Sequence, residues 1–285
     1  MRLEYRIQIN DDGRRAGKLA ASVFKLSNRD IEYLKASSSL LIDQKPYRMI
    51  DRVQYGQLLT VILPEPKKAE KAVSSISILY EDDALMVIDK PSGLATMSSH
   101  AVSGDSVEKC MQESFGDFRP VNRLDKGTGG LMVCAKSAYM QHRLSDQLHT
   151  DRFIREYIAV VEGRCNSPFG KIELPIGHMN GQTNLRCIRP DGKPCITYFR
   201  TLKTTENRSM LRLRLITGRT HQIRVHLSAC GLPICGDYLY GTALEEKPGF
   251  FALHSTYLFL QHPLTSERLF FVSDPEKSFM QLLEE

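Results

Sequence analysis

The 285-residue sequence has no hydrophobic segment long enough to cross a membrane. Its longest apolar runs, such as Ala84–Ile88 and Tyr157–Val161, contain five residues each, whereas a membrane-spanning helix needs about 20. The first residues, MRLEYRIQINDD, lack the apolar core of a signal peptide. We therefore expect a cytoplasmic protein without a membrane partner.

The cysteines are too scattered to form a disulfide framework. The seven cysteines are odd in number and scattered along the chain, at positions 110, 134, 165, 187, 195, 230 and 235. Small secreted domains instead carry an even number of cysteines at close spacings. This arrangement favours a reducing compartment, in agreement with the cytoplasm.

Motifs for nucleotide binding and for serine hydrolases are also missing. The sequence contains neither a P-loop nor a G-x-S-x-G elbow. The glycines in Gly127–Gly130 do not have the spacing of a dinucleotide-binding turn. These absences exclude the commonest phosphate-binding and covalent hydrolytic sites.

The candidate metal ligands do not have the right spacing either. His221 and His226 are five residues apart, so they do not share a helical face as an i, i+4 pair would. Pro194-Cys195 lacks the second cysteine of a zinc deaminase, and the acidic run Glu81-Asp82-Asp83 is typical of a hairpin turn. We expect chemistry that uses neither a metal nor a cofactor.

The composition is that of an ordinary globular protein with a moderate positive charge. Hydrophobic residues make up 42% and charged residues 25% of the chain, with a net charge of +5 and a pI near 8.8. Such a length allows a sizeable core in one or two domains. The charge leans toward a polyanionic partner without establishing one.

Residues 1–66 are predicted to form a small separate domain. Its apolar spacing indicates two short helices within Ala16–Lys35, broken near Ser27-Asn28, followed by strands in SLLID and GQLLTVILP around a turn at Gln44-Lys45-Pro46. It holds 11 basic against 8 acidic residues, an excess of +3. Residues 67–75, within the polar stretch Pro64–Ser75, are predicted to be a linker.

Residues 76–285 are predicted to form a second, α+β domain. A hairpin is expected from ISILY and ALMVIDK, and interspersed helices and strands argue against a doubly wound parallel sheet. Helices are expected at 106–115, 137–149, 220–230 and the C-terminus, and strands at 155–161, 185–189, 194–200, 210–216, 250–260 and 268–273.

Three segments carry candidate functional residues. In VNRLDKGTGG, Arg123 and Asp125 alternate with Leu124, so both polar side chains point the same way on an extended segment. REYIAVV is a strand with Tyr157 beside charges, and TGRTHQIRVHL is an amphipathic helix on which Arg224 is free to face a cleft. Singly, these segments also suit a surface ion pair, a core tyrosine and a solvated basic helix. Their coexistence favours a site.

Together these segments resemble motifs of the RluA family of RNA pseudouridine synthases. ILYEDDALMVIDKPSGL resembles the opening hairpin of that family, VNRLDKGTGGLMVCAKS its catalytic-aspartate motif, REYIAVVEG its tyrosine strand and ITGRTHQIRVHLSACGLPICGDYLYG its long third motif. The resemblance spans Ile76 to Phe271. Residues 1–66 are similar to the small S-four-type RNA-binding domain of many members.

The resemblance implies a pseudouridine synthase fold, with a mixed and mostly antiparallel central sheet, preceded by a small α/β RNA-binding domain. It implies that uridines in structured RNA are isomerised to pseudouridine by a monomeric enzyme without a cofactor. Large-subunit ribosomal RNA is the expected substrate, with transfer RNA as an alternative. A flipped-out base is required, because a base inside a stem is inaccessible.

The resemblance assigns the catalytic roles to three residues. Asp125 is the nucleophile or base, and Arg224, with Arg219 as second choice, favours its ionised form. Tyr157 stacks on the target ring and offers its hydroxyl.

Four further residues are expected to contact the RNA. They are Arg123, Arg219, His221 and Leu227, with Arg123 filling the space left by the flipped base. We also expect the glycines after Asp125 to let the RNA backbone approach closely.

The sequence departs from the family pattern at three places. Asn122 stands where histidine is usual, Gly129 where serine is usual, and Ser98-Ser99-His100 where His-Pro is common. None of them replaces a catalytic residue, so they bear on substrate placement and local rigidity. Two other functions remain open, namely a non-catalytic RNA-binding protein in ribosome assembly and a metal-dependent nuclease or phosphoesterase.

Overall fold

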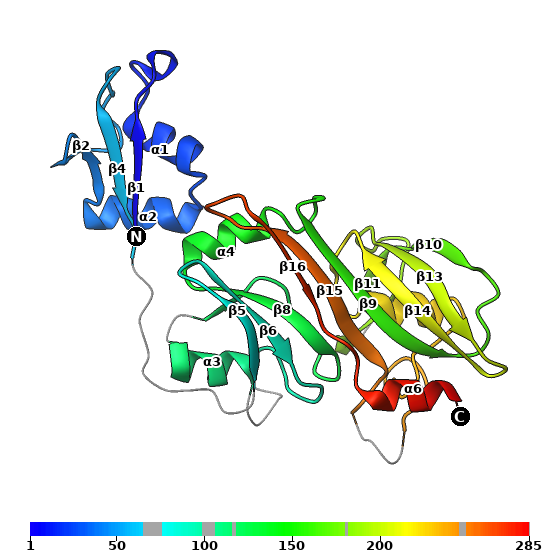
Figure 1. The fold of residues 1–285 in the computed structure, drawn as a ribbon. Coiled ribbons are helices and arrows are strands. Elements are labelled where there is room, and N and C mark those ends of the chain that lie inside the picture. Colours follow the sequence, from blue (N-terminus) through cyan, green and yellow to red (C-terminus); the bar gives the residue numbers. More distant parts are fainter. Residues whose placement is uncertain (65–75, 99–105, 116–117, 180–181, 245–248, 285) are drawn as a thin grey trace.

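The computed structural model describes residues 1–64, 76–98, 106–115, 118–179, 182–244 and 249–284 (Figure 1). The predicted linker, 67–75, lies outside the described residues. Within them, no helix is long and apolar enough to cross a membrane.

The N-terminal residues build a sheet of their own. Its four strands pair antiparallel in the order β1-β4-β2-β3, and two helices pack with it. The helices are separate because Ser27 and Asp30 form a capping box, in which each side chain bonds the backbone N–H of the other. The elements are β1 (Arg2–Arg6), the 3-10 helix η1 (Ile9–Asp11), α1 (Ala16–Phe24), α2 (Asn28–Ser37), β2 (Leu40–Ile42), β3 (Lys45–Pro46) and β4 (Leu58–Ile62).

The remaining residues are organised by a ten-stranded sheet. Its main path is β10-β13-β14-β9-β15-β8-β6-β5, with β16 paired to β15 and β7 paired to β8. Neighbouring strands of this sheet run antiparallel except β8 and β15, which run parallel. The predicted α+β fold with a mostly antiparallel mixed sheet is therefore confirmed.

The strands of this part are β5 (Ser77–Glu81), β6 (Leu85–Lys90), β7 (Arg119–Pro120), β8 (Gly129–Ala135), β9 (Phe153–Glu162), β10 (Phe169–Glu173), β11 (Ile176–Met179), β12 (Gln182–Ile188), β13 (Ile196–Thr204), β14 (Arg208–Leu215), β15 (Leu253–Gln261) and β16 (Arg268–Val272). The helices are α3 (Val107–Phe115), α4 (Ala138–Ser145), α5 (Gln222–Ala229) and α6 (Lys277–Glu284). A small two-stranded sheet joins β11 and β12.

The expected hairpin is present as β5 and β6, with Asp82 in its turn. Three strands of this part, β7, β10 and β11, were not predicted; in β10 Ile172 is the single buried residue, which leaves no alternating pattern to read. The helix expected at 137–149 ends at Ser145. Beyond it, Gln147 bonds both backbone groups of Gln261, which holds the chain in a turn.

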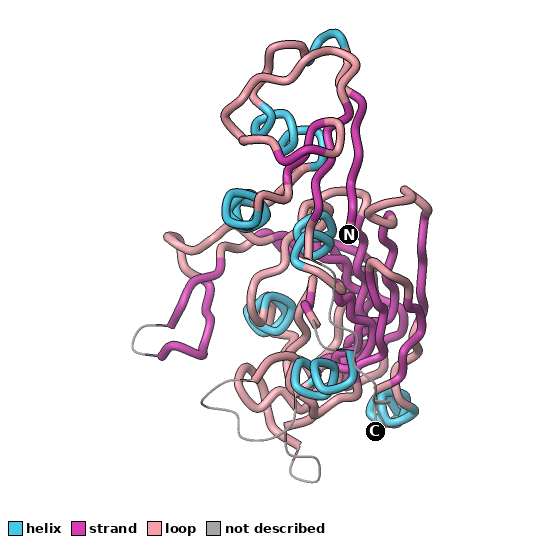
Figure 2. The backbone as a smooth tube through the Cα atoms, turned by 90° about the vertical axis from the view of Figure 1, so that its left-hand side faces the viewer, coloured by secondary structure: helices cyan, strands magenta, loops and turns pink. Residues whose placement is uncertain are grey.

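Helices cover both faces of the sheet. Alternate residues of β6 face different cores: Met86 and Ile88 pack with α3, α5 and α6, whereas Leu85 and Val87 lie in the cluster that includes α4. Figures 1 and 2 show the N-terminal unit as a lobe beyond the end of the sheet, next to α4. There the Tyr139 hydroxyl of α4 donates a hydrogen bond to the carbonyl oxygen of Phe24 at 2.7 Å.

Candidate active site

Asp125 lies in the loop that leads into β8, and its backbone is firmly held. The Thr96 hydroxyl donates to the Leu124 carbonyl at 2.6 Å and accepts from the Leu124 N–H at 3.2 Å. All three residues border one pocket, but Leu124 is buried, whereas Arg123 is exposed and Asp125 is partly exposed. The alternation expected from the sequence is therefore present.

Asn122, which stands where the family usually has histidine, helps to fix the same loop. Its side-chain oxygen accepts a hydrogen bond from the Val133 N–H at 2.8 Å. The residue is buried and faces the strand rather than the pocket. Its role in this chain is to attach the catalytic loop to β8.

The glycines after Asp125 do not open a path for RNA, contrary to the expectation above. A Cβ atom at Gly127 would lie 2.5 Å from Phe251, and one at Gly130 would lie 2.2 Å from the Ser255 carbonyl oxygen. At Gly129 the nearest atom is Nδ1 of His254, 3.2 Å away. The space beside these glycines is filled by the protein, so their function is close packing of the loop.

Arg224 connects Asp125 to a second carboxylate. Its Nη1 donates to Asp125 Oδ2 at 3.1 Å, while Nε and Nη2 donate to the two oxygens of Asp237 at 2.8 and 2.7 Å. Arg224 and Asp237 are buried, and the side chain of Asp125 is 25% exposed. The predicted pairing of Arg224 with Asp125 is thus present, and Arg219 does not take this place.

Aromatic rings enclose the guanidinium group of Arg224. Its central carbon lies 4.3 Å from the ring centre of Phe251 and 5.0 Å from that of Tyr240. Burial acts to lower the pKa of Arg224, but the hydrogen bonds to Asp237 and the charges of Asp237 and Asp125 raise it above its ordinary value. Arg224 is therefore a permanent cation beside Asp125.

Tyr157 enters the same pocket from β9, the strand beside β15 and β14. It is 4% exposed. Burial raises the pKa of Tyr157, and the charge of Asp125 adds to this effect. The phenol is consequently neutral and can donate a proton in a hydrogen bond.

His221 closes another side of the pocket. It precedes α5 in a left-handed conformation with φ of 57°, and its Nε2 lies 3.9 Å from Asp125 Oδ1. Its Nδ1 lies 2.7 Å from the Tyr240 hydroxyl. Burial lowers the pKa of His221, although the charge of Asp125 opposes this shift, so the ring is neutral at pH 7.

Of the other predicted contact residues, Arg123 and Arg219 lie exposed at the pocket rim. Leu227 does not join them. Its side chain is buried in the core, where it borders a separate hollow with Arg164 and Cys165. Leu227 does not line the pocket of Asp125, and its assignment to substrate binding stays a prediction.

Several residues of the site were missed by the sequence analysis. Asp237 lies in the segment matched to the third motif but received no role. Gln222 fixes the rim, because its side-chain oxygen accepts from the Arg219 N–H and its amide donates to Ile196. Lys90 is buried at the end of β6, and its Nζ donates to the carbonyls of Pro91, Leu94 and Lys126.

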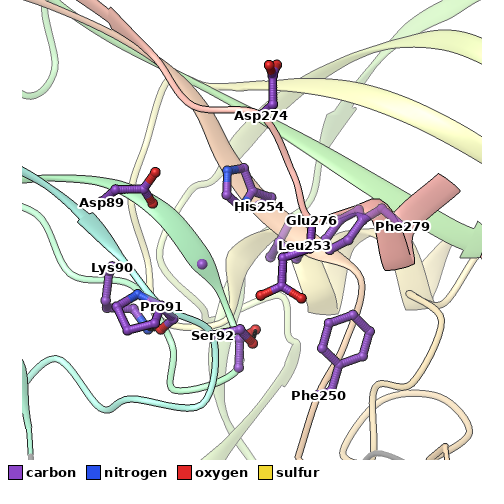
Figure 3. Close-up of a pocket in the computed structure, with 12 residues that line it drawn as sticks. Asp89, Lys90, Pro91, Ser92, Phe250, Leu253, His254, Asp274, Glu276 and Phe279 are labelled. Carbon is purple, nitrogen blue, oxygen red and sulfur yellow. Dashed lines mark hydrogen bonds between the residues drawn. The ribbon is translucent and has the colours of Figure 1, made fainter. Parts of the chain in front are cut away.

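A second hollow borders the loop that carries Asp125, because Gly127 and Gly129 help to line it. Lys90, Ser92 and His254 line it as well (Figure 3). Within it, His254 Nε2 lies 2.9 Å from the Ser273 hydroxyl, which donates to Asp89 at 2.6 Å. This chain of hydrogen bonds joins β15 to β6 across β8. In the described residues, no group of three or more potential ligands could hold a metal ion.

The pocket therefore combines an ion-paired carboxylate, a neutral phenol and an apolar wall from Leu215, Ile223 and Leu253. A planar, uncharged ring fits between such groups, and the carboxylate can act on it as nucleophile or base. The two arginines at the rim suit a polyanionic strand. These properties define an enzyme that acts on a base of a nucleic acid.

Comparison with known proteins identifies this class more closely. A sequence profile described as RNA pseudouridylate synthase matches residues 84–229. The chain belongs to the family of RNA pseudouridine synthases, which are isomerases, and the resemblance to the RluA family is confirmed.

Similar proteins cover most of the chain. A protein of Bacillus subtilis named uncharacterized RNA pseudouridine synthase YjbO is 35% identical over 76% of this chain and 79% of its own length. Ribosomal large subunit pseudouridine synthase D is 33% identical in Vibrio vulnificus, covering 82% of this chain and 78% of its own. The protein of the same name in Pseudomonas aeruginosa is 32% identical, covering 95% of this chain and 91% of its own length.

Solved structures agree on the fold. Human RNA pseudouridylate synthase domain containing 1 superposes with a TM-score of 0.60 at 25% identity, covering 74% of this chain and 88% of its own. Human RNA pseudouridylate synthase domain containing 4 superposes with a TM-score of 0.58 at 24% identity, covering 73% of this chain and 92% of its own.

Proposed function

We propose that this protein converts specific uridines of large-subunit ribosomal RNA to pseudouridine, with Asp125 as the nucleophile or base. The observation that carries the proposal is the Asp125–Arg224 ion pair of 3.1 Å beside Tyr157 in one pocket. The choice of RNA is supported by relatives named as ribosomal large subunit pseudouridine synthases. Transfer RNA is the second candidate.

The reaction moves one bond of the nucleotide and conserves all its atoms. The bond from ribose to N1 of uracil breaks, the uracil rotates, a bond from ribose to C5 forms, and the proton at C5 is exchanged for one at N1. The carboxylate of Asp125 attacks or deprotonates, Arg224 pairs with it, and Tyr157 stacks on the ring and offers its hydroxyl. One chain supplies all three side chains, which is consistent with a monomer.

The residues at the rim bind the RNA in this proposal. Arg123 fills the space left by the flipped uridine, while Arg219 and His221 contact the RNA next to it. Residues 1–66 add affinity as an S-four-type domain, because they hold an excess charge of +3 and none of the catalytic motifs.

The test is tritium release from RNA labelled at C5 of uridine, with wild-type and Asp125→Asn proteins. We expect release by the wild type and none by D125N, since an amide is neither a base nor a nucleophile at neutral pH. RNA affinity and thermal stability of D125N should stay unchanged. Release by folded D125N would contradict the assigned role. Tight binding by a wild type that releases no tritium would favour a non-catalytic RNA-binding protein.

A map of pseudouridines in a strain lacking the gene, compared with its parent, identifies the substrate. Loss of a site in large-subunit ribosomal RNA is the expected result. Loss confined to transfer RNA would overturn the choice of substrate but not the chemistry.

A further inference from the structure

Arg155 is a buried cation beside the proposed catalytic tyrosine. It lies on β9 two residues before Tyr157, so both side chains are on the same face of the sheet. It is 6% exposed. No ion pair joins it to a carboxylate within the described residues. The central carbon of its guanidinium lies 5.7 Å from the ring centre of Phe153.

One edge of the Arg155 guanidinium has no partner. Its Nε and Nη2 are buried and make no hydrogen bond with any described residue. In Arg224 the same two nitrogens hold both oxygens of Asp237. A buried donor pair without an acceptor is costly, and its geometry matches a group with two anionic oxygens.

Gly218 packs directly against this group and covers it at the pocket rim. A Cβ atom at position 218 would lie 3.1 Å from Nη1 and 3.4 Å from Nη2 of Arg155. Gly218 is exposed, and its neighbours Leu215 and Arg219 line the pocket of Asp125. Arg155 therefore lies behind Gly218, next to the rim of the pocket.

We propose that Arg155 binds a phosphodiester of the substrate RNA next to the flipped uridine, which reaches it past Gly218. The inference rests on the proposed function. A phosphate matches the guanidinium edge with two anionic oxygens, whereas a uracil carbonyl is neutral and offers one oxygen. RNA brings a phosphate with every nucleotide. Both nitrogens are covered in the free protein, so the rim at Gly218 opens as the phosphate enters.

The experiment measures RNA affinity against salt, the single-turnover rate at saturating RNA and the melting temperature. Arg155→Met should bind RNA about tenfold more weakly. The slope of log affinity against log salt should fall by about 0.7–0.9, as for one lost phosphate contact. The rate at saturating RNA should stay within about threefold.

Two further variants separate charge from shape. Arg155→Lys keeps the charge without the planar fork, so it should keep the salt slope and lose part of the affinity. Gly218→Ala keeps Arg155 and narrows the approach; because φ at Gly218 is not left-handed, alanine fits the backbone. It should weaken binding as Arg155→Met does, and it decides the question if Arg155→Met fails to fold. Arg268→Met, on exposed β16, is the control and should change neither affinity nor slope.

Two results would overturn the proposal. An unchanged affinity and salt slope in Arg155→Met and Gly218→Ala would show a structural role. A lower saturating rate at unchanged affinity would show that Arg155 acts on Tyr157 instead. The binding data are independent of turnover, so an inactive wild type would contradict the proposed function while leaving this test intact.

Discussion

At the scale of single residues, the site depends on how the donors of Arg224 are divided. Two nitrogens are occupied by Asp237 and a third is directed at Asp125. Asp237 also accepts from the backbone N–H groups of Leu239 and Tyr240, which fixes its position. Asp237 is therefore the residue that orients Arg224, and Arg224 in turn holds the carboxylate of Asp125.

The variant Asp237→Asn tests this arrangement. We expect a loss of unfolding free energy of about 3 kcal/mol, because a buried arginine loses its charged partner. The single-turnover rate should fall more than tenfold, because Arg224 loses its orientation. Urea denaturation and tritium release measure the two effects. The control is Asp151→Asn at an exposed position, and full activity in Asp237→Asn would refute the orienting role.

At the scale of elements, the catalytic loop is held where β8 runs parallel to β15. Gly129 pairs with His254 and Gly130 with Ser255. Gly130 has φ of +101° and lies so close to Ser255 that no side chain fits. The close approach of the two strands places Asp125, just before β8, against the pocket.

Alanine substitutions at these two glycines should differ in effect. Gly130→Ala should lower the unfolding free energy by about 3 kcal/mol or abolish folding, because it adds both a clash and a strained backbone. Gly129→Ala, with its nearest contact at 3.2 Å, should cost less than about 1 kcal/mol. Urea denaturation of the pair is the measurement, and equal losses would contradict this explanation.

Lys90 ties β6 to the catalytic loop and should make stability depend on pH. Burial lowers the pKa of Lys90 to about 7, although the charge of Asp125 opposes the shift. The ordinary value, near 10.4, applies to the unfolded chain. Between about pH 7 and pH 10 the unfolded chain therefore binds a proton that the folded protein lacks. The contribution of Lys90 to stability rises with pH in this window, by at most about 1.4 kcal/mol per pH unit.

The comparison is between wild type and Lys90→Met, denatured with urea at pH 7, 8 and 9. The unfolding free energy of the wild type, minus that of the variant, should increase as the pH rises. Lys126→Met, whose side chain is exposed on the same loop, should follow the wild type. Parallel curves for wild type and Lys90→Met would rule out a buried, neutralised lysine.

At the scale of the whole molecule, the N-terminal lobe carries most of the excess positive charge, whereas the part with the large sheet contains the candidate active site. The lobe holds an excess of +3 of the total +5, and the pocket lies wholly in the second part. The Tyr139–Phe24 hydrogen bond joins them through α4 and α1. The arrangement suits an enzyme whose lobe holds RNA while the sheet positions the catalytic groups.

Deletion of residues 1–66 should weaken RNA binding and reduce its dependence on salt, because phosphate contacts are lost. The single-turnover rate at saturating RNA should remain near that of the full chain. Thermal melting checks that the remainder folds, and Tyr139→Phe controls for the lost hydrogen bond alone. An unchanged salt slope would show that the lobe makes no phosphate contacts with the RNA. Inactivity of a folded truncated protein would show that the lobe also contributes to catalysis.

The sequence by itself determined most of the elements and three of the central residues of the site. Hydrophobic periodicity over nine or ten residues marks α1, α2 and β9. The order of the motifs along the chain marks the segments around Asp125, Tyr157 and Arg224. Such signals depend only on residues that are close in the sequence, so they can be read from the sequence alone. Short edge strands such as β10, with one buried residue, leave no such signal.

The tertiary structure alone decided which groups meet. Asp237 follows Arg224 by 13 residues, yet the turn after α5 brings it back to the guanidinium. The glycines beside Asp125 pack against Phe251 and Ser255, which the parallel pairing of β8 and β15 places there. Within the described residues, Nε and Nη2 of Arg155 lack an acceptor for the same reason. The neighbours of a side chain are set by strand order and by loops that join distant segments, and periodicity along one strand carries no record of them.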